Sequence, residues 1–349
     1  MNLSQQHPTS PGRENDCKNY FGNNLPWRFS SPDSFYGLLV AGAVINLAAC
    51  PFTILLNALI LIAVKTKRRL QTHPNILLAC LSLTDLMTGL VAQPLCITVV
   101  IFLLQGKQSC YTQLAFTVFL GIFMFATVFH LLLISGERYL AIKHTFRYAT
   151  VVTNSRLIIS SAVAWSAAIV IFPVAFAYFA VALFIGKIII LSSIILLHIF
   201  VYNEVRRHEK RIISEQASVE ARAKFKQEKK ALKLTTIILV TIFLCMFLPS
   251  IFVLIARQIF RRTFPPDEED IKTLVQLAGA VLTIINSILN PVIYTLWKRQ
   301  FRIAFIELLL RKSLQEAEQF DEKLFRSRID AARPQNGPES AGQAGTDHS

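Results

Sequence analysis

The chain has 349 residues, of which 53% are hydrophobic and only 17% are charged, and its formal net charge is +14. This composition is too apolar for a typical soluble domain, and the apolar residues fall in long runs. The basic residues are divided among several loops rather than gathered on one module, which argues against a nucleic-acid-binding protein.

Seven apolar segments are long enough to cross a bilayer, which takes about 20 residues per helix. In chain order they are Tyr36–Val64, Asn75–Leu103, Tyr111–Ile142, Ser155–Tyr178, Val181–Val205, Ala231–Arg257 and Ile271–Trp297. We predict a break between Phe172 and Ala180, because one unbroken helix there would be far longer than a bilayer requires. The sequence thus predicts an all-α membrane protein, a bundle of seven transmembrane helices.

The loops differ in charge, and this difference predicts an orientation. Basic residues concentrate after the first, third, fifth and seventh segments, whereas the loop before the seventh holds the acidic run 267–270. The positive-inside rule then places the N-terminus outside the cell and the C-terminus in the cytoplasm, with the chain in the plasma membrane. We expect residues 1–35 to be an extracellular segment, without an evident signal peptide, and residues 36–310 to be the helical domain. Residues 311–349 are polar and charged, and are predicted to be a disordered cytoplasmic tail.

Two features belong to the predicted outer side. Asn2 begins an Asn-Leu-Ser sequon and is an expected glycosylation site. Cys17 and Cys110 both face an oxidising compartment in this topology. A Cys17–Cys110 disulfide and two free thiols both remain open, because no spacing argument favours the bond.

Most of the segments carry one residue or run that is unusual for a helix in lipid. These are Asn57, Asp85, Glu137-Arg138-Tyr139, Trp165, Phe243-Leu244-Cys245-Met246-Phe247-Leu248-Pro249 and Asn290-Pro291-x-x-Tyr294. Buried polar groups need partners in hydrocarbon, and a proline bends its helix. These six features, in this order and each in its own segment, resemble those of the rhodopsin-like (class A) G-protein-coupled receptors, and the resemblance extends over all seven segments. Their pattern is most similar to the melanocortin, adenosine, cannabinoid and lysophospholipid branch.

The resemblance implies a receptor rather than an enzyme, with an outward ligand pocket and an inward cleft for a heterotrimeric G protein. It also implies arrestin and membrane lipids as partners. After Trp297, basic and apolar residues alternate at helical spacing through Phe305, which predicts a short amphipathic eighth helix on the anionic inner leaflet.

The resemblance also assigns a candidate ion site around Asp85. An unpaired carboxylate at this depth is costly, and hard cations take oxygen ligands. The family positions that surround a sodium ion are matched here by Asp85, Asn57, Thr127, Asn286, Ser287 and Asn290. A protonated, hydrogen-bonded carboxyl group without an ion is the alternative, and no other cofactor is expected.

The switch residues of the family have counterparts at the inward end. In the family, the arginine matched by Arg138 pairs with its acidic neighbour, here Glu137, and then swings toward the G protein. Tyr202 and Tyr294 match the tyrosines that close on the activated arginine, and Phe146 matches a residue that enters a pocket on the G protein. The family's acidic lock at the foot of the sixth segment is matched by Lys229, so we expect appreciable basal signalling.

The predicted ligand pocket is mostly apolar. Its residues are Phe116, Leu120, Met124, Phe247, Ile251, Leu254, Gln276, Ala280 and Thr283, with Lys187 and Arg257 near the outer rim. We hypothesise an apolar or lipid-like ligand, with an acidic head near one of the two cations. Leu120 replaces the aspartate of amine receptors, and Ile284 replaces the retinal-binding lysine of opsins, so neither ligand class fits. A peptide or a nucleoside is the alternative within the family, and a secondary transporter or channel is the alternative outside it.

Overall fold

The computed structural model describes residues 32–105, 107, 109–178, 180–214, 219, 229, 232–233, 236–237, 240–241, 244 and 268–331, and all regular elements among them are helical. The long helices are α2 (Pro32–Thr66), α5 (Cys110–Lys143), α7 (Asn154–Tyr178), α8 (Ala180–Ser214) and α10 (Glu268–Trp297). The second predicted segment is α3 (His73–Met87), a π-helical turn η2 (Thr88–Ala92) and α4 (Gln93–Leu104). The shorter elements are η1 (Arg68–Leu70), α6 (Thr145–Val151), α11 (Arg299–Leu310) and α12 (Leu314–Ala331).

The helices agree with the predicted segments, except that most of the sixth segment lies outside the described residues. Within the described part, four helical stretches are long and apolar enough to cross a membrane: Leu39–Thr66, His73–Leu104, Cys110–Lys143 and Asn154–Tyr178. Helix α7 passes through Pro173 and ends at Tyr178, and α8 begins at Ala180. The two helices are separate elements, and they end and begin inside the interval in which the sequence predicted a break.

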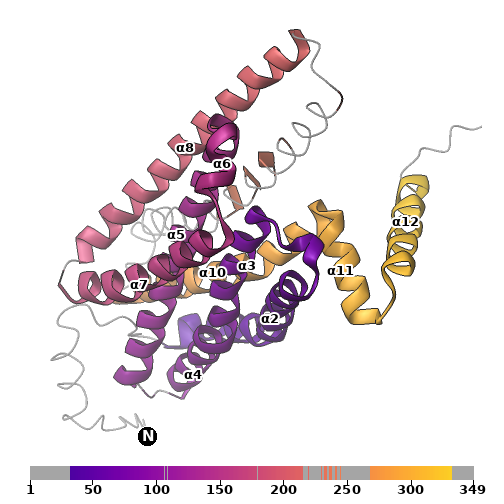
Figure 1. The fold of residues 1–349 in the computed structure, drawn as a ribbon. Coiled ribbons are helices and arrows are strands. Elements are labelled where there is room, and N and C mark those ends of the chain that lie inside the picture. Colours follow the sequence, from indigo (N-terminus) through magenta and orange to yellow (C-terminus); the bar gives the residue numbers. More distant parts are fainter. Residues whose placement is uncertain are drawn as a thin grey trace, which may run out of the picture.

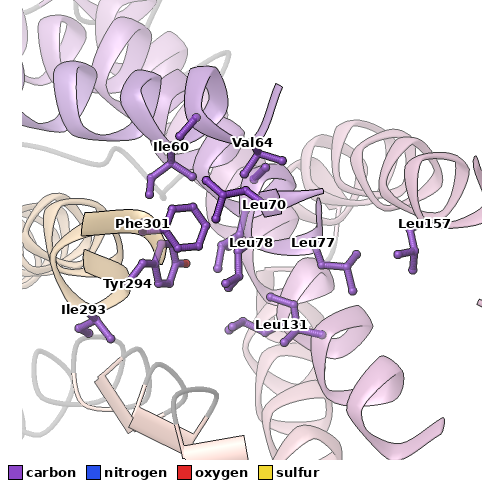
Figure 2. Close-up of a cluster of buried hydrophobic side chains, with 14 of the residues drawn as sticks. Ile60, Val64, Leu70, Leu77, Leu78, Leu131, Leu157, Ile293, Tyr294 and Phe301 are labelled. Carbon is purple, nitrogen blue, oxygen red and sulfur yellow. The ribbon is translucent and has the colours of Figure 1, made fainter. Parts of the chain in front are cut away.

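Helix α5 packs against α3, α7 and α8, while α2 packs against α3, α4 and α10 (Figure 1). An apolar cluster joins α2, α3, α5, α7, α8 and α10 at the end of the bundle where α11 lies (Figure 2). Leu70 of η1, Leu131 of α5, Tyr294 of α10 and Phe301 of α11 are all fully buried in it. The ring centroids of Tyr294 and Phe301 lie 6.3 Å apart, so α11 packs against the last turn of α10.

A cluster of ion pairs fastens α11 to the connection between α2 and α3. Arg69 donates from Nη1 and Nη2 to the two carboxylate oxygens of Glu307, at 3.1 and 3.0 Å. The Nζ atom of Lys67 lies 2.8 Å from Glu307 Oε2, and the Glu307 side chain is 4% exposed. Burial acts to raise the pKa of Glu307, but the hydrogen bonds from Lys67 and Arg69 outweigh it and lower this pKa below its usual value.

Replacing Glu307 with glutamine is expected to destabilise the folded chain by about 1 kcal/mol, because two partly exposed cations lose their shared partner. The folded-state pKa of Glu307 is depressed, so its contribution is present above the ordinary carboxyl pKa and is lost as pH falls through the folded value. Thermal unfolding of the detergent-purified chain at pH 7 and pH 4 measures this. The variant should unfold at a lower temperature at pH 7, and the difference should shrink at pH 4. Glu318→Gln, at an exposed position, is the control, and equal midpoints at pH 7 would contradict the prediction.

The structure differs from the sequence prediction in the tail. We predicted disorder from residue 311 onward, but α12 forms over Leu314–Ala331. Its start is a capping box: the Ser313 amide and hydroxyl donate to Glu316 Oε2 at 2.8 and 3.0 Å, and the Glu316 amide faces Ser313 Oγ at 3.4 Å. Average polarity predicted disorder, whereas local capping and ion pairs stabilise a helix. Residues 332–349 lie outside the described part.

Candidate functional site

A buried polar cluster surrounds Asp85, which lies in α3 and is 1% exposed. Asn290 of α10 donates from Nδ2 to Asp85 Oδ2 at 2.8 Å, and the Ser287 side chain also hydrogen-bonds Asp85. Pro291 follows inside the same helix. The predicted carboxylate and the Asn290-Pro291 motif, 205 residues apart in sequence, therefore meet directly.

Two further helices join the cluster through the predicted residues. Asn57 of α2 donates from Nδ2 to the Ser287 carbonyl at 3.0 Å and to the Thr53 carbonyl at 2.9 Å. Thr127 of α5 lies 3.1 Å, oxygen to oxygen, from Thr84, the residue before Asp85. The cluster thus connects α2, α3, α5 and α10 in the bundle interior.

The donor set fits a hard cation. The side-chain carbonyl oxygens of Asn57, Asn286 and Asn290 are buried, and none has a hydrogen-bond partner among the described residues. Unpartnered buried oxygens are costly, and together with a carboxylate they are the ligand type that sodium or another hard cation takes. The residues that would hold the ion are Asp85 and these asparagines, with Thr127 and Ser287 in support. A bound cation would supply only charge compensation there.

A second polar group lies at the end of α5, where Glu137 and Arg138 are both buried. Arg138 donates from Nε and Nη2 to the two carboxylate oxygens of Glu137, each at 2.6 Å. The hydroxyl of Tyr148 in α6 also donates to Glu137, and Nδ1 of His73 lies 3.2 Å from that hydroxyl. The ion pair is therefore held from α6 and from the first residue of α3. Tyr139, next in the motif, accepts a hydrogen bond from Lys143 at 2.7 Å instead.

The two predicted switch tyrosines lie in different environments. Tyr294 is fully buried, and its hydroxyl has no hydrogen-bond partner within the described structure. Tyr202 in α8 is 49% exposed, and the Arg206 guanidinium lies 5.5 Å from its ring centroid. The side chains of Phe146 and Lys187 lie outside the described part.

Lys298, between α10 and α11, is a site residue that the sequence placed only among the basic residues after the seventh segment. Its Nζ donates to Asn75 Oδ1 at 2.7 Å, and it interacts electrostatically with Arg138 and Glu137. Burial and the positive charge of Arg138 lower the pKa of Lys298 to about 7, against the opposing effect of Glu137. Its place directly after the Tyr294 motif is the one sequence signal that could have singled it out.

The predicted pocket is described only in part. Phe116 is buried in an apolar cluster of α2, α4 and α5, Leu120 packs against that cluster, and Met124 is partly buried. The side chains of Gln276, Ala280 and Thr283 in α10 lie outside the described residues, as do Phe247, Ile251, Leu254, Arg257, Asn2 and Cys17. Cys110 is disulfide-bonded, so it is not a free thiol.

A polar pair between α2 and α4 was not predicted from the sequence. Asn46 donates from Nδ2 to the backbone carbonyl oxygen of Gln93 at 3.2 Å, and Gln93 is fully buried. Neither side-chain amide atom of Gln93 has a hydrogen-bond partner in the part of the chain described. The π-helical turn η2 ends directly before Gln93, and such turns occur frequently at functional sites. A glutamine followed by a proline inside an apolar segment was the available signal.

Comparison with known proteins agrees with this arrangement. The family model of the seven-transmembrane receptors of the rhodopsin family matches residues 56–181 and 172–294. The dog (Canis lupus familiaris) adenosine receptor A2b is 33% identical over 121 residues, which cover 35% of this chain and 36% of the relative. The adenosine receptor A3 of Bos taurus is 33% identical over 31% of this chain and 33% of its own length. The trace amine-associated receptor 13c of Danio rerio is 30% identical over 35% of each chain.

The chain thus spans about a third of the length of these curated relatives. The family match is wider and covers the ranges that hold the Asp85 cluster, the Glu137–Arg138 pair and Tyr294. It identifies a receptor rather than an enzyme, a transporter or a channel. The chain is a multi-pass membrane protein and belongs to the rhodopsin family of seven-transmembrane receptors.

Proposed function

We propose that the chain is a plasma-membrane receptor, with its N-terminus outside, that transmits the binding of an extracellular ligand to a heterotrimeric G protein. The observation that supports this best is the buried bidentate pair of Glu137 and Arg138 at the end of α5. Separating a buried arginine from its carboxylate is costly if either charge stays buried alone, so Arg138 can leave Glu137 only by exchanging it for other partners when the helices move. Such an exchange of partners gives the arginine two alternative states, as a two-state switch requires.

In this proposal the Asp85 cluster couples ligand binding to the switch. It connects α3 to α10 through Asn290, four residues before Tyr294, whose buried hydroxyl lacks a partner among the described residues. A shift of α10 that brings Tyr294 to the released Arg138 would satisfy that hydroxyl and stabilise the signalling state. The G protein would then bind at the end of α5, and arrestin and inner-leaflet lipids are further proposed partners.

Cells that express the chain together with reporters for several G-protein classes test the proposal. We expect a basal signal above that of mock-transfected cells in at least one reporter, because Lys229 cannot form the acidic lock described for the family. Surface labelling of an epitope at the N-terminus checks both expression and orientation. Normal surface expression without basal or ligand-induced signal in every reporter would contradict the proposed function.

Two ligand classes can be compared in the same cells. The apolar residues Phe116 and Leu120 favour an apolar or lipid-like ligand. The buried Gln93 amide favours a ligand that presents a donor beside an acceptor, as a nucleobase does, and a glutamine can pair with both edge atoms of adenine. The names of the adenosine-receptor relatives also favour a nucleoside. A panel of lysophospholipids, fatty acids, nucleosides and peptides distinguishes these classes. A response to nucleosides that Gln93→Leu removes would support a nucleoside ligand. A response to lipids alone would support a lipid-like ligand.

A further inference from the structure

Helix α12 lies beside α11 at the edge of the bundle and is attached to it by ion pairs (Figure 1). Asp321 receives Arg302 Nε at 2.8 Å and Nη2 at 3.4 Å, and Arg299 Nε at 3.3 Å. The Asp321 side chain is only 2% exposed. Glu322 accepts from Arg299 Nη2 at 2.9 Å, but both of these side chains are more than half exposed. The buried carboxylate of Asp321 therefore carries most of the electrostatic contribution, because exposed pairs contribute little.

The attachment uses one face of α12. Ala317 is fully buried and lies four residues before Asp321, so both residues occupy the same side of the helix. The capping box of Ser313 and Glu316 orders the first turn of α12, and Lys312 lies 4.5 Å from the Phe320 ring centroid. Helix α12 thus packs against α11 in a defined register.

The same arginine connects α12 to the end of α10. Arg302 Nη1 donates to the carbonyl oxygens of Leu296 at 2.9 Å and Thr295 at 3.4 Å. The last carbonyls of a helix lack partners within that helix, so Arg302 caps α10 while it binds Asp321. A continuous set of bonds therefore runs from the tail helix to the residue that follows Tyr294.

We propose that α12 is an intramolecular latch that holds the end of α10 against α11 and thereby limits signalling. The proposal rests on the proposed G-protein function of the Tyr294 end of α10. When Asp321 is docked, it fixes the Arg302 guanidinium in the position that caps Thr295 and Leu296. When α12 detaches, Arg302 loses its buried counter-ion and turns to solvent or lipid phosphate, and the last turn of α10 is free to move.

The variant Asp321→Asn tests the latch, since it removes the charge and keeps the shape. Spin labels on the full-length chain in nanodiscs, at the exposed positions Gln300 and Gln319, report the distance between α11 and α12. We expect a narrow distance distribution in the wild-type chain and a broad one in the variant. The basal signal, normalised to surface expression, should rise about fivefold, at the lower end of typical coupling factors. Glu318→Gln, which changes an exposed carboxylate of the same helix, should alter neither readout.

An unchanged distance distribution in Asp321→Asn would overturn the latch, because Asp321 would then not hold the helix. A broadened distribution with an unchanged or lower basal signal would also overturn it, because the detached helix would have no regulatory effect. If the wild-type chain signals in no reporter, the proposed function itself fails, and the distance measurement still shows whether α12 docks through Asp321.

Discussion

Replacing Arg138 with leucine is expected to abolish both basal and ligand-induced signalling, while the protein still reaches the cell surface. Arg138 is the buried cation that we assign to G-protein binding, and leucine cannot replace its bidentate hydrogen bonds. The same change leaves the Glu137 carboxylate buried without its main counter-ion. An uncompensated buried charge of this kind costs about 3–5 kcal/mol, so the variant should also unfold at a lower temperature.

The measurement is the reporter signal per receptor at the surface, compared with Arg147→Leu, which removes an exposed cation from the neighbouring α6. That control should signal normally. Glu137→Gln should raise the basal signal, because it weakens the ion pair with Arg138 and leaves the arginine available to bind the G protein. Retained signalling in Arg138→Leu would exclude this arginine from the transducing step.

The helical framework could be predicted because its signals are local and strong. Apolar runs of bilayer length give the spans, and the combined length of residues 155–205, which is far more than one crossing needs, predicted the division between α7 and α8. The Asp85 and Asn290 positions could be paired in advance only through the resemblance to a known family. Periodicity places each residue in its own helix, but it does not state which helices are neighbours.

Other features depended on contacts that the sequence does not display. Lys298 was one of several basic residues after the seventh span, and only its contact with Asn75 and its position near Arg138 distinguish it. Helix α12 was missed for a related reason. Its composition is polar, and it is stabilised by its capping box and by ion pairs to Arg299 and Arg302 on another helix, which composition does not show.

Gln93 illustrates a different limit. A single glutamine in an apolar segment suggests a bundle-facing position, but its direction depends on helix phase. The π-helical turn η2 adds one residue to a turn and rotates everything that follows, and no sequence pattern here announces it. The pocket prediction therefore emphasised apolar residues, and the buried amide of Gln93 became evident only from the fold.

Sodium is expected to raise the unfolding temperature of the wild-type chain and to have no specific effect on Asp85→Asn. A ligand that binds only the folded state stabilises it by RT ln(1 + [L]/Kd), which is about 1.4 kcal/mol when the ion is at ten times its dissociation constant. Asparagine keeps the shape of Asp85 and can still hydrogen-bond Asn290, but it lacks the negative charge that binds a cation. The folded state should therefore survive the substitution while the ion effect disappears.

Thermal unfolding in sodium chloride and in choline chloride at equal ionic strength separates a bound ion from general screening. Ser166→Ala, which removes an exposed hydroxyl that donates to the Ala162 carbonyl of the same helix, should retain the full sodium effect. Equal midpoints of the wild-type chain in the two salts would instead favour the protonated carboxyl, held by Asn290 and Ser287 without an ion. In that case the unpartnered amide oxygens of Asn57, Asn286 and Asn290 would need water as their partner, because burial without any partner costs each of them free energy.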